Sequence, residues 1–112
     1  MKDDRLYFVH ILDCIDHILQ FTGDGKGSFL ADRKTQDAVL RNLHTLSESI
    51  QRTSTDTKLN YPAVPWREIG AFRNVVVHDY LGIDLERIWD IVERDLPPLK
   101  TQIKEILDEF GK

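Results

Sequence analysis

Three large polar side chains interrupt an apolar stretch in the second half of the chain. Arg73, His78 and Tyr80 stand within residues 66–80, which are otherwise rich in valine, isoleucine and aromatic residues. An arginine is costly to bury without a partner, and its guanidinium can hold a phosphate through two parallel hydrogen bonds. A histidine exchanges protons near neutral pH. The pair therefore suits cleavage of a phosphodiester bond, although on spacing alone a structural role for both residues is the simpler explanation.

The helical spacing of these residues shows which of them share a face. At about 100° per residue, Arg73 and Tyr80 are about 20° apart, and Asn74 and His78 align at i and i+4. Arg73 and His78 are about 140° apart, so they do not converge within one straight helix. The site therefore needs an unwound helix end before Gly82 or a second copy of the chain. A two-fold homodimer with this helix in its interface would place two motifs side by side.

Apolar residues recur at intervals of three and four along nearly the whole chain, which predicts an all-α protein. We expect an antiparallel bundle of four to five helices. The predicted helices run from Asp3 or Asp4 to Gly23, from Asp32 to Arg52, from Pro65 to Gly82, from Asp84 to Leu96, and onward from Pro97–Pro98. Residues 23–28 are predicted as a turn, residues 53–65 as a loop, and the two prolines as an interruption.

The chain of 112 residues has the composition of a folded protein, with 41% hydrophobic and 30% charged residues. We expect one domain over residues 1–112. The single cysteine excludes an intrachain disulfide framework and suits a reducing cytoplasm. No apolar run approaches the roughly 20 residues of a membrane span. The net charge is −4, but residues 33–73 carry seven basic and four acidic side chains, giving +3. This basic middle either forms an anion-binding face or reflects chance segregation.

Two other groups of residues have the types, but not the spacing, of a ligand site. Residues 23–28 contain Gly and Lys, but they lack the Gly-Lys-Ser/Thr order and the preceding strand of a phosphate-binding loop. His10, Cys14 and His17 lie on one helical stripe, but the two histidines are about 10 Å apart along the axis. That separation is too long for one metal ion, so we expect no metal site here.

Two tryptophans and one glutamate have more than one possible role. Trp66 and Trp89 are predicted as core anchors rather than platforms for stacking a base. Glu48 lies on an otherwise apolar face of the second predicted helix. Its carboxylate is either solvated at the edge of the bundle or directed into a polar pocket near the third predicted helix.

The residues of the third predicted helix match the motif of a known superfamily. Arg73, Asn74, His78 and Tyr80 fit the R-x-x-x-x-H-x-Y motif of the HEPN superfamily. The surrounding sequence resembles the HepT toxins from about residue 5 to residue 107, and the similarity is carried by residues 32–38, 64–69 and 80–89. The chain departs from the pattern at Ser47-Glu48-Ser49, where Gly-Glu-Ala is expected. The carboxylate is kept, but the glycine that would permit a close helix approach is absent.

The resemblance implies a function and partners that the residue pattern alone does not. HepT-like proteins are helical, dimeric, metal-independent ribonuclease toxins of prokaryotic toxin–antitoxin modules, and cleavage of either mRNA or tRNA fits the family. Arg73 and His78 would then be the catalytic residues, with Asn74 and Tyr80 in supporting roles and no cofactor. The implied partner is an MntA-like nucleotidyltransferase antitoxin, which can transfer AMP from ATP to the motif tyrosine, here Tyr80.

Two other functions are kept as alternatives. HEPN domains also accompany nucleotidyltransferases as non-catalytic, helical substrate-binding partners, but such a scaffold does not require an intact Arg73 and His78. The third reading is a plain dimeric bundle in which these two residues are satisfied interface residues. For the ribonuclease reading we expect action in the cytoplasm on an RNA substrate, with no membrane association.

Overall fold

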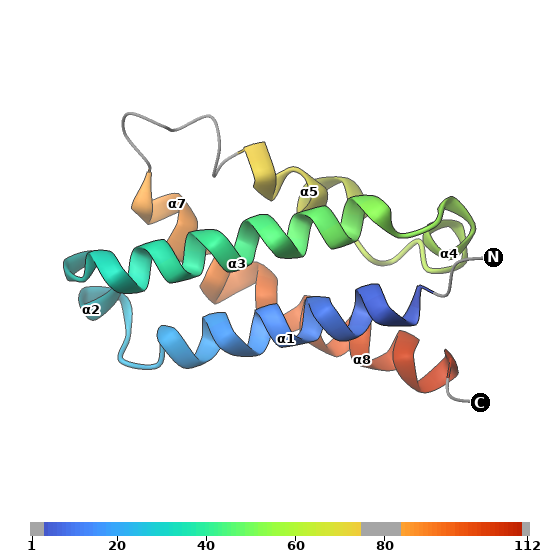
Figure 1. Cartoon of the computed structure of the whole chain (residues 1–112), viewed down its shortest axis with the longest axis horizontal. Coiled ribbons are helices and arrows are strands. Elements are labelled where there is room, and N and C mark those ends of the chain that lie inside the picture. The colour runs from blue at the N-terminus through green and yellow to red at the C-terminus, as the bar shows by residue number, and fades with distance from the viewer. Residues whose placement is uncertain (1–3, 75–83, 111–112) are drawn as a thin grey trace.

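Two long antiparallel helices form one layer of the molecule. The computed structural model describes residues 4–74 and 84–110. Helix α1 (Arg5–Phe21) packs along α3 (Arg33–Arg52), and this is the most extensive helix–helix contact of the described chain (Figure 1). The described residues contain no strand, which confirms the predicted all-α class.

Helix α3 begins where the sequence predicts it to begin. The carboxylate of Asp32 accepts the backbone N–H of Lys34 at 3.1 Å and the hydroxyl of Thr35 at 2.8 Å. An aspartate in this position satisfies a backbone N–H that has no partner within the helix. The predicted extent of this helix, from Asp32 to Arg52, is therefore confirmed.

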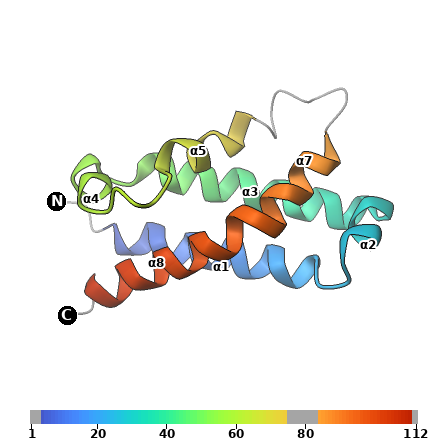
Figure 2. The ribbon, with the colours of Figure 1, turned by 180° about the vertical axis from the view of Figure 1, so that it is seen from behind.

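A third long helical segment crosses behind this pair (Figure 2). It consists of α7 (Leu85–Asp90), a π-helical turn η1 (Ile91–Asp95) and α8 (Leu96–Phe110), which follow one another without a break. The carboxylate of Asp84 accepts the backbone N–H of Arg87 and so caps α7. The core lies between this segment and the α1–α3 pair.

The two consecutive prolines do not interrupt the chain, so the predicted break was wrong. Pro97 and Pro98 lie in the first turn of α8. Proline lacks the N–H that continues an α-helical ladder. The ladder widens just before them, because the N–H of Leu96 bonds to the carbonyl of Ile91, five residues back. This π-helical turn adapts the hydrogen bonding to the prolines, so that the helical segment continues through them.

Two short helices occupy stretches that were predicted as a turn and a loop. Helix α2 (Lys26–Ala31) begins after Gly25, whose φ of 95° suits a residue without a side chain. Lys26 pairs with Glu86 at 2.6 Å and thereby joins α2 to α7. Helix α4 (Thr55–Asn60) lies within the predicted loop. With these two short helices, residues 4–74 and 84–110 contain more helices than the predicted four to five.

Asp4 precedes α1, as one of the two predicted starting points of this helix, but its side chain makes no capping hydrogen bond to it. Its carboxylate instead accepts the backbone N–H of Ser54 at 3.2 Å and the hydroxyls of Ser54 and Thr57, each at 2.6 Å. The hydroxyl of Ser54 also caps α4 by accepting the backbone N–H of Thr57. Asp4 therefore connects the start of α1 to the start of α4, 50 residues later.

The core is built from aliphatic and aromatic side chains of all three long segments. The largest fully buried members are Phe8, Phe29, Ile11, Ile15, Ile18, Leu43, Leu46, Ile50, Ile69, Ile88, Leu96 and Leu99. Trp89 is buried against Phe29, with ring centroids 5.7 Å apart. Trp66 is half-buried and packs against this core. The prediction that both tryptophans are core anchors is thus confirmed.

Candidate functional site

The segment that contains the start of the motif packs against α3 with its apolar side chains and exposes its polar side chains. Helix α5 (Trp66–Gly70) is followed by a turn at Ala71 and a helical stretch over residues 72–74. Ile69 and Phe72 are 2% and 6% exposed and face the core. Their neighbours Arg67 and Arg73 are exposed. The helical period therefore holds the polar side chains at the surface while the apolar ones fix the helix.

Trp66 fixes the start of α5. Its indole N–H donates to the backbone carbonyls of Lys58 at 3.1 Å and Tyr61 at 3.0 Å. Its ring lies 6.2 Å from that of Phe8, centroid to centroid. The tryptophan thus ties α4, the following loop and α5 to α1, which holds the approach to the motif in place.

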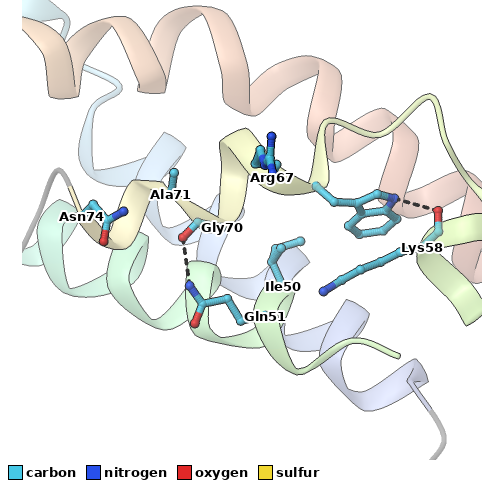
Figure 3. A pocket seen from close by; sticks show the side chains of 8 residues that line it. Ile50, Gln51, Lys58, Arg67, Gly70, Ala71 and Asn74 are labelled. Carbon is cyan, nitrogen blue, oxygen red and sulfur yellow. Dashed lines mark hydrogen bonds between the residues drawn. The ribbon is translucent and has the colours of Figure 1, made fainter. Parts of the chain in front are cut away.

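A pocket of about 480 Å³ opens between α3, α4 and α5 (Figure 3). Ile50 and Gln51 of α3 form one wall, and Lys58 of α4 lies near Trp66 at one end. The amide of Gln51 donates to the carbonyl of Gly70 at 3.2 Å and holds the two helices together.

The opposite wall of this pocket is formed by α5 and the residues just after it. Arg67, Gly70, Ala71 and Asn74 all line the pocket, from α5 through the turn at Ala71 to the helical stretch over residues 72–74. Asn74 belongs to the motif and lines the pocket. Arg73, the residue before it, is exposed. The pocket therefore leads directly to the first two motif residues.

The other two motif residues lie outside the described part of the chain. His78 and Tyr80 belong to residues 75–83, so neither their contacts nor the predicted end of this helix near Gly82 are tested. The convergence of Arg73 with His78, and the homodimer that would supply it, both stay predictions.

A second pocket, of about 310 Å³, lies on the other side of α5, against α8. Ile69, Phe72 and Leu99 supply apolar surface, while Glu68 and Asp95 supply carboxylates. Burial raises the pKa of Asp95 above its ordinary value, and the nearby arginines only partly offset this effect. Helix α5 thus separates a pocket with basic side chains from one with acidic side chains.

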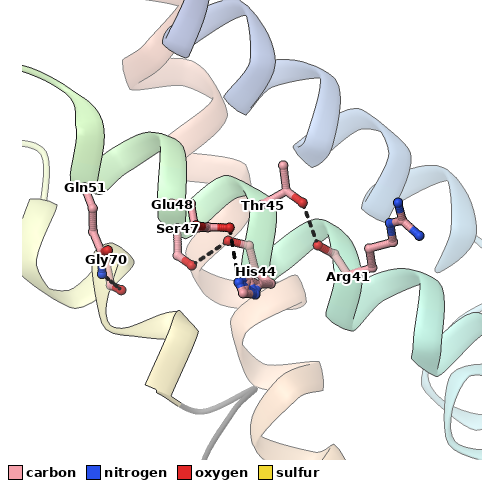
Figure 4. A network of polar contacts seen from close by, with 7 residues as sticks. All are labelled: Arg41, His44, Thr45, Ser47, Glu48, Gln51 and Gly70. Carbon is pink, nitrogen blue, oxygen red and sulfur yellow. Dashed lines mark hydrogen bonds and ion pairs between the residues drawn. The ribbon is translucent and has the colours of Figure 1, made fainter.

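Polar residues of α3 continue the surface beside the pocket (Figure 4). Glu48 pairs with His44 at 3.2 Å on its own helix, and its side chain is 42% exposed. This arrangement favours the predicted position at the bundle edge over one inside a pocket. Ser47 is fully buried, but its hydroxyl donates to the carbonyl of His44 at 2.9 Å. The serine that replaces the expected glycine is therefore accommodated by its own helix.

The histidines and the cysteine of α1 do not converge. His10 and His17 are exposed, whereas Cys14 is 3% exposed and faces the core. Burial, together with the neighbouring Asp13, raises the pKa of the Cys14 thiol to about 11. Within residues 4–74 and 84–110, no group of three or more potential ligands could hold a metal ion.

Sequence reasoning missed Lys58, Arg67 and Gln51 as neighbours of the motif. The spacing of Arg67 and Asn74, seven residues apart, was a signal that these two share a face. Lys58 gave no comparable signal, because it lies in a segment predicted as a loop. Across the described residues, no helix combines the length and hydrophobicity needed to cross a membrane.

Comparisons with known proteins show which family and which individual proteins this chain is similar to. A model of the HepT-like ribonuclease family matches residues 11–106. A Methanocaldococcus jannaschii protein named provisionally as an RNase is 38% identical over 97% of this chain and 91% of its own length. The probable ribonuclease HepT of Thermococcus cleftensis is 35% identical over 94% of this chain and 96% of its own length.

A second Methanocaldococcus jannaschii protein is longer than the region of similarity. It is named as a gamma-glutamylcyclotransferase and, provisionally, an RNase, and it is 33% identical over 99% of this chain. The chain spans 50% of that protein's length. The comparison with solved structures gave no match.

Proposed function

Because the chain belongs to the family of HepT-like ribonucleases, we propose that it cleaves RNA with Arg73 and His78 as its catalytic residues. One observation supports this proposal above all: the family match covers residues 11–106, the range of the sequence in which Arg73 and His78 lie. The exposed position of Arg73 beside a pocket with basic side chains supports it, because an RNA phosphate needs an accessible cation.

The proposed reaction uses the 2′-hydroxyl of the RNA as the nucleophile. His78 accepts the 2′-hydroxyl proton or donates a proton to the leaving 5′-oxygen. A bond forms between the 2′-oxygen and phosphorus while the bond from phosphorus to the 5′-oxygen breaks, which gives a 2′,3′-cyclic phosphate and a 5′-hydroxyl. Arg73 holds the phosphate and stabilises its added negative charge, and Asn74 orients the phosphate or His78. No metal ion takes part.

The proposed active form is a two-fold homodimer with the motif helix in its interface. A continuous helix would separate Arg73 and His78 by about 140°, and this expectation supports the dimer, since two copies can supply both groups to one phosphate. Light scattering should give twice the chain mass at concentrations where the protein is active. An active monomer would contradict the dimer.

The proposed biological role is that of a cytoplasmic toxin in a toxin–antitoxin module. An MntA-like nucleotidyltransferase antitoxin would neutralise it by transferring AMP from ATP to the hydroxyl of Tyr80, with release of pyrophosphate. Tyr80 is two residues from His78 in the sequence. The AMP would add about one negative charge and a bulky base where the RNA must bind.

Inducible expression of matched variants tests the ribonuclease proposal. We expect the wild type to stop growth and fragment total RNA, and Arg73→Ala and His78→Ala each to lower cleavage by about 10² or more. His10→Ala and Arg33→Ala change exposed residues of the same types and should behave as wild type. Purified protein should cleave RNA in EDTA. Full cleavage by either motif variant, or complete inhibition by the chelator, would contradict the assignment.

A further inference from the structure

We propose that the pocket between α3, α4 and α5 binds the sugar–phosphate backbone of two or three RNA nucleotides next to the cleaved bond, with Lys58 and Arg67 as its phosphate contacts. This inference rests on the proposed ribonuclease function and extends it from the cleaved phosphate to the neighbouring strand. It assigns a binding role to two residues outside the motif.

The charge of the pocket is the first argument. Lys58 and Arg67 line it, and none of the described residues around it is acidic. Neither cation forms an ion pair with another described residue, while the chain as a whole carries a net charge of −4. Asp4 interacts electrostatically with Lys58, but its carboxylate is occupied by the hydrogen bonds from Ser54 and Thr57. Positive charge is therefore concentrated here and available to an anion.

The length of the pocket is the second argument. Arg67 and Asn74 both line the pocket and are seven residues apart, and seven residues of largely helical backbone, with the turn at Ala71 between them, cover roughly 10 Å. In a stacked strand each nucleotide advances about 3.4 Å along the axis, and the advance is longer in an extended strand. Two or three nucleotides therefore span the distance from Arg67 to the motif. Gly70 and Ala71 lie between these ends, and their small size leaves room for the backbone of the strand.

The rigidity of the walls is the third argument. The indole N–H of Trp66 holds the backbone carbonyls of Lys58 and Tyr61, and the amide of Gln51 holds the carbonyl of Gly70. The side chain of Asn74 has no hydrogen-bond partner in the described ranges, so its amide is free to contact a phosphate or a ribose. A pocket held in this way requires little ordering when a strand binds.

The acidic pocket on the other side of α5 supports the same path. Glu68 and Asp95 line that pocket and would repel a polyanion. Because one short helix separates the two pockets, RNA that enters near Arg73 is attracted to one side and repelled from the other. The distribution of charge therefore selects the pocket lined by Lys58 and Arg67.

The test is binding of a fluorescent 2′-O-methyl RNA 12-mer of mixed sequence, followed by anisotropy at several salt concentrations. The methyl group blocks the nucleophile, so binding is measured without cleavage. The variants are Lys58→Gln and Arg67→Gln, singly and combined. Lys104→Gln and Arg33→Gln are matched controls, since both side chains are exposed and neither lines the pocket. Circular dichroism confirms that each variant is folded.

Each pocket variant should lower the salt slope of log Kd by about 0.7, the value for one phosphate on a single strand. Extrapolated from 1 M salt, this corresponds to a Kd about fourfold higher at 0.15 M for each variant and about 15-fold higher for the double variant. The controls should keep the wild-type slope. Equal slopes in pocket variants and controls, or no binding by the wild type, would overturn the proposal.

Two further arms separate this proposal from its alternatives. His78→Ala should lose cleavage of unmodified RNA, and in this background Lys58→Gln and Arg67→Gln should still lower the salt slope of binding. Binding that depends on Lys58 and Arg67 without any cleavage by the wild type would overturn the ribonuclease proposal and leave the pocket as an RNA site. A poly-glutamate 12-mer serves as a second probe. If it binds as tightly as RNA with the same dependence on Lys58, the occupant is an acidic protein segment and the RNA assignment is wrong.

Discussion

Replacement of Asp4 by asparagine should loosen the junction between α1 and α4. Asp4 is 6% exposed, and its Oδ2 accepts both hydroxyls while its Oδ1 accepts the backbone N–H of Ser54. Asparagine has nearly the same shape, but its amide nitrogen donates and cannot accept. In either orientation, the amide nitrogen therefore faces at least one donor that the carboxylate oxygens now satisfy.

The expected size of the effect follows from these hydrogen bonds. A hydrogen bond to a charged group stabilises a protein by about 1.5–3 kcal/mol, and one such bond or more is lost. We expect Asp4→Asn to lower the free energy of unfolding at pH 7 by about 2 kcal/mol. For a protein of this size, that corresponds to a fall in melting temperature of about 8 °C.

The pH dependence gives this prediction a definite sign. Burial alone would raise the pKa of Asp4, but hydrogen bonds from Ser54 and Thr57 outweigh it and hold the pKa below the ordinary value of 3.8. A carboxyl with a depressed folded-state pKa stabilises the protein above its unfolded-state pKa, and this stabilisation is lost as the pH falls through the folded-state value. The difference between wild type and Asp4→Asn should therefore be full at pH 5–7 and shrink at still lower pH.

Urea unfolding of wild type and Asp4→Asn at pH 7 and at about pH 3 provides the assay. Asp13→Asn is the matched control, because Asp13 is an exposed aspartate in α1, the helix that Asp4 precedes. An Asp4→Asn variant no less stable than Asp13→Asn at pH 7 would refute the reasoning from the hydrogen bonds. A stability difference of unchanged size at pH 3 would refute the reasoning from the pKa.

Three other predictions follow from the described packing and from the proposed function. Ile69→Ala should destabilise the protein by about 2–4 kcal/mol in urea unfolding and reduce RNA cleavage, whereas Glu68→Ala at an exposed neighbouring position should leave stability nearly unchanged. Because burial raises the pKa of the Cys14 thiol to about 11, a thiol reagent at pH 8 should label it slowly in the folded protein and rapidly in urea, and equal rates would contradict its burial. On co-expression with an active antitoxin, intact mass should increase by AMP in the wild type but not in Tyr80→Phe, and an increase that persists in the variant would exclude this tyrosine.

The parts of the fold that sequence predicted correctly are those with local signals. Helix α3 carries its cap, Asp32, and its apolar stripe within one segment, so its extent could be read directly. Helix α4 was missed because none of its residues is buried and Leu59 is 72% exposed. The contacts at its start come from Asp4, 50 residues away. The break predicted at Pro97 was wrong, because local residue propensities do not indicate the π-helical turn that accommodates the prolines.

The sequence indicated candidate residues of the motif, but it did not indicate which residues of other helices lie beside them. Arg73 was singled out because a polar group in an apolar run stands out in the sequence, and Asn74 because it fits the superfamily motif, and the roles of both stay predictions. Lys58 and Gln51 were not singled out, because their approach to α5 depends on the packing of three helices. Neither residue differs in its local sequence from an ordinary surface residue, so only the folded chain places them beside the motif.

Helix α5 is a common wall of two pockets, and this makes their volumes interdependent. A displacement of α5 toward α3 narrows the pocket at Arg67 and widens the one at Glu68, and the reverse displacement does the opposite. Occupants of the two pockets would therefore be linked thermodynamically, and each would change the affinity for the other by the same factor. A substitution that repacks Ile69 alters both pockets at once, so its effect on one of them cannot be interpreted without measuring the other.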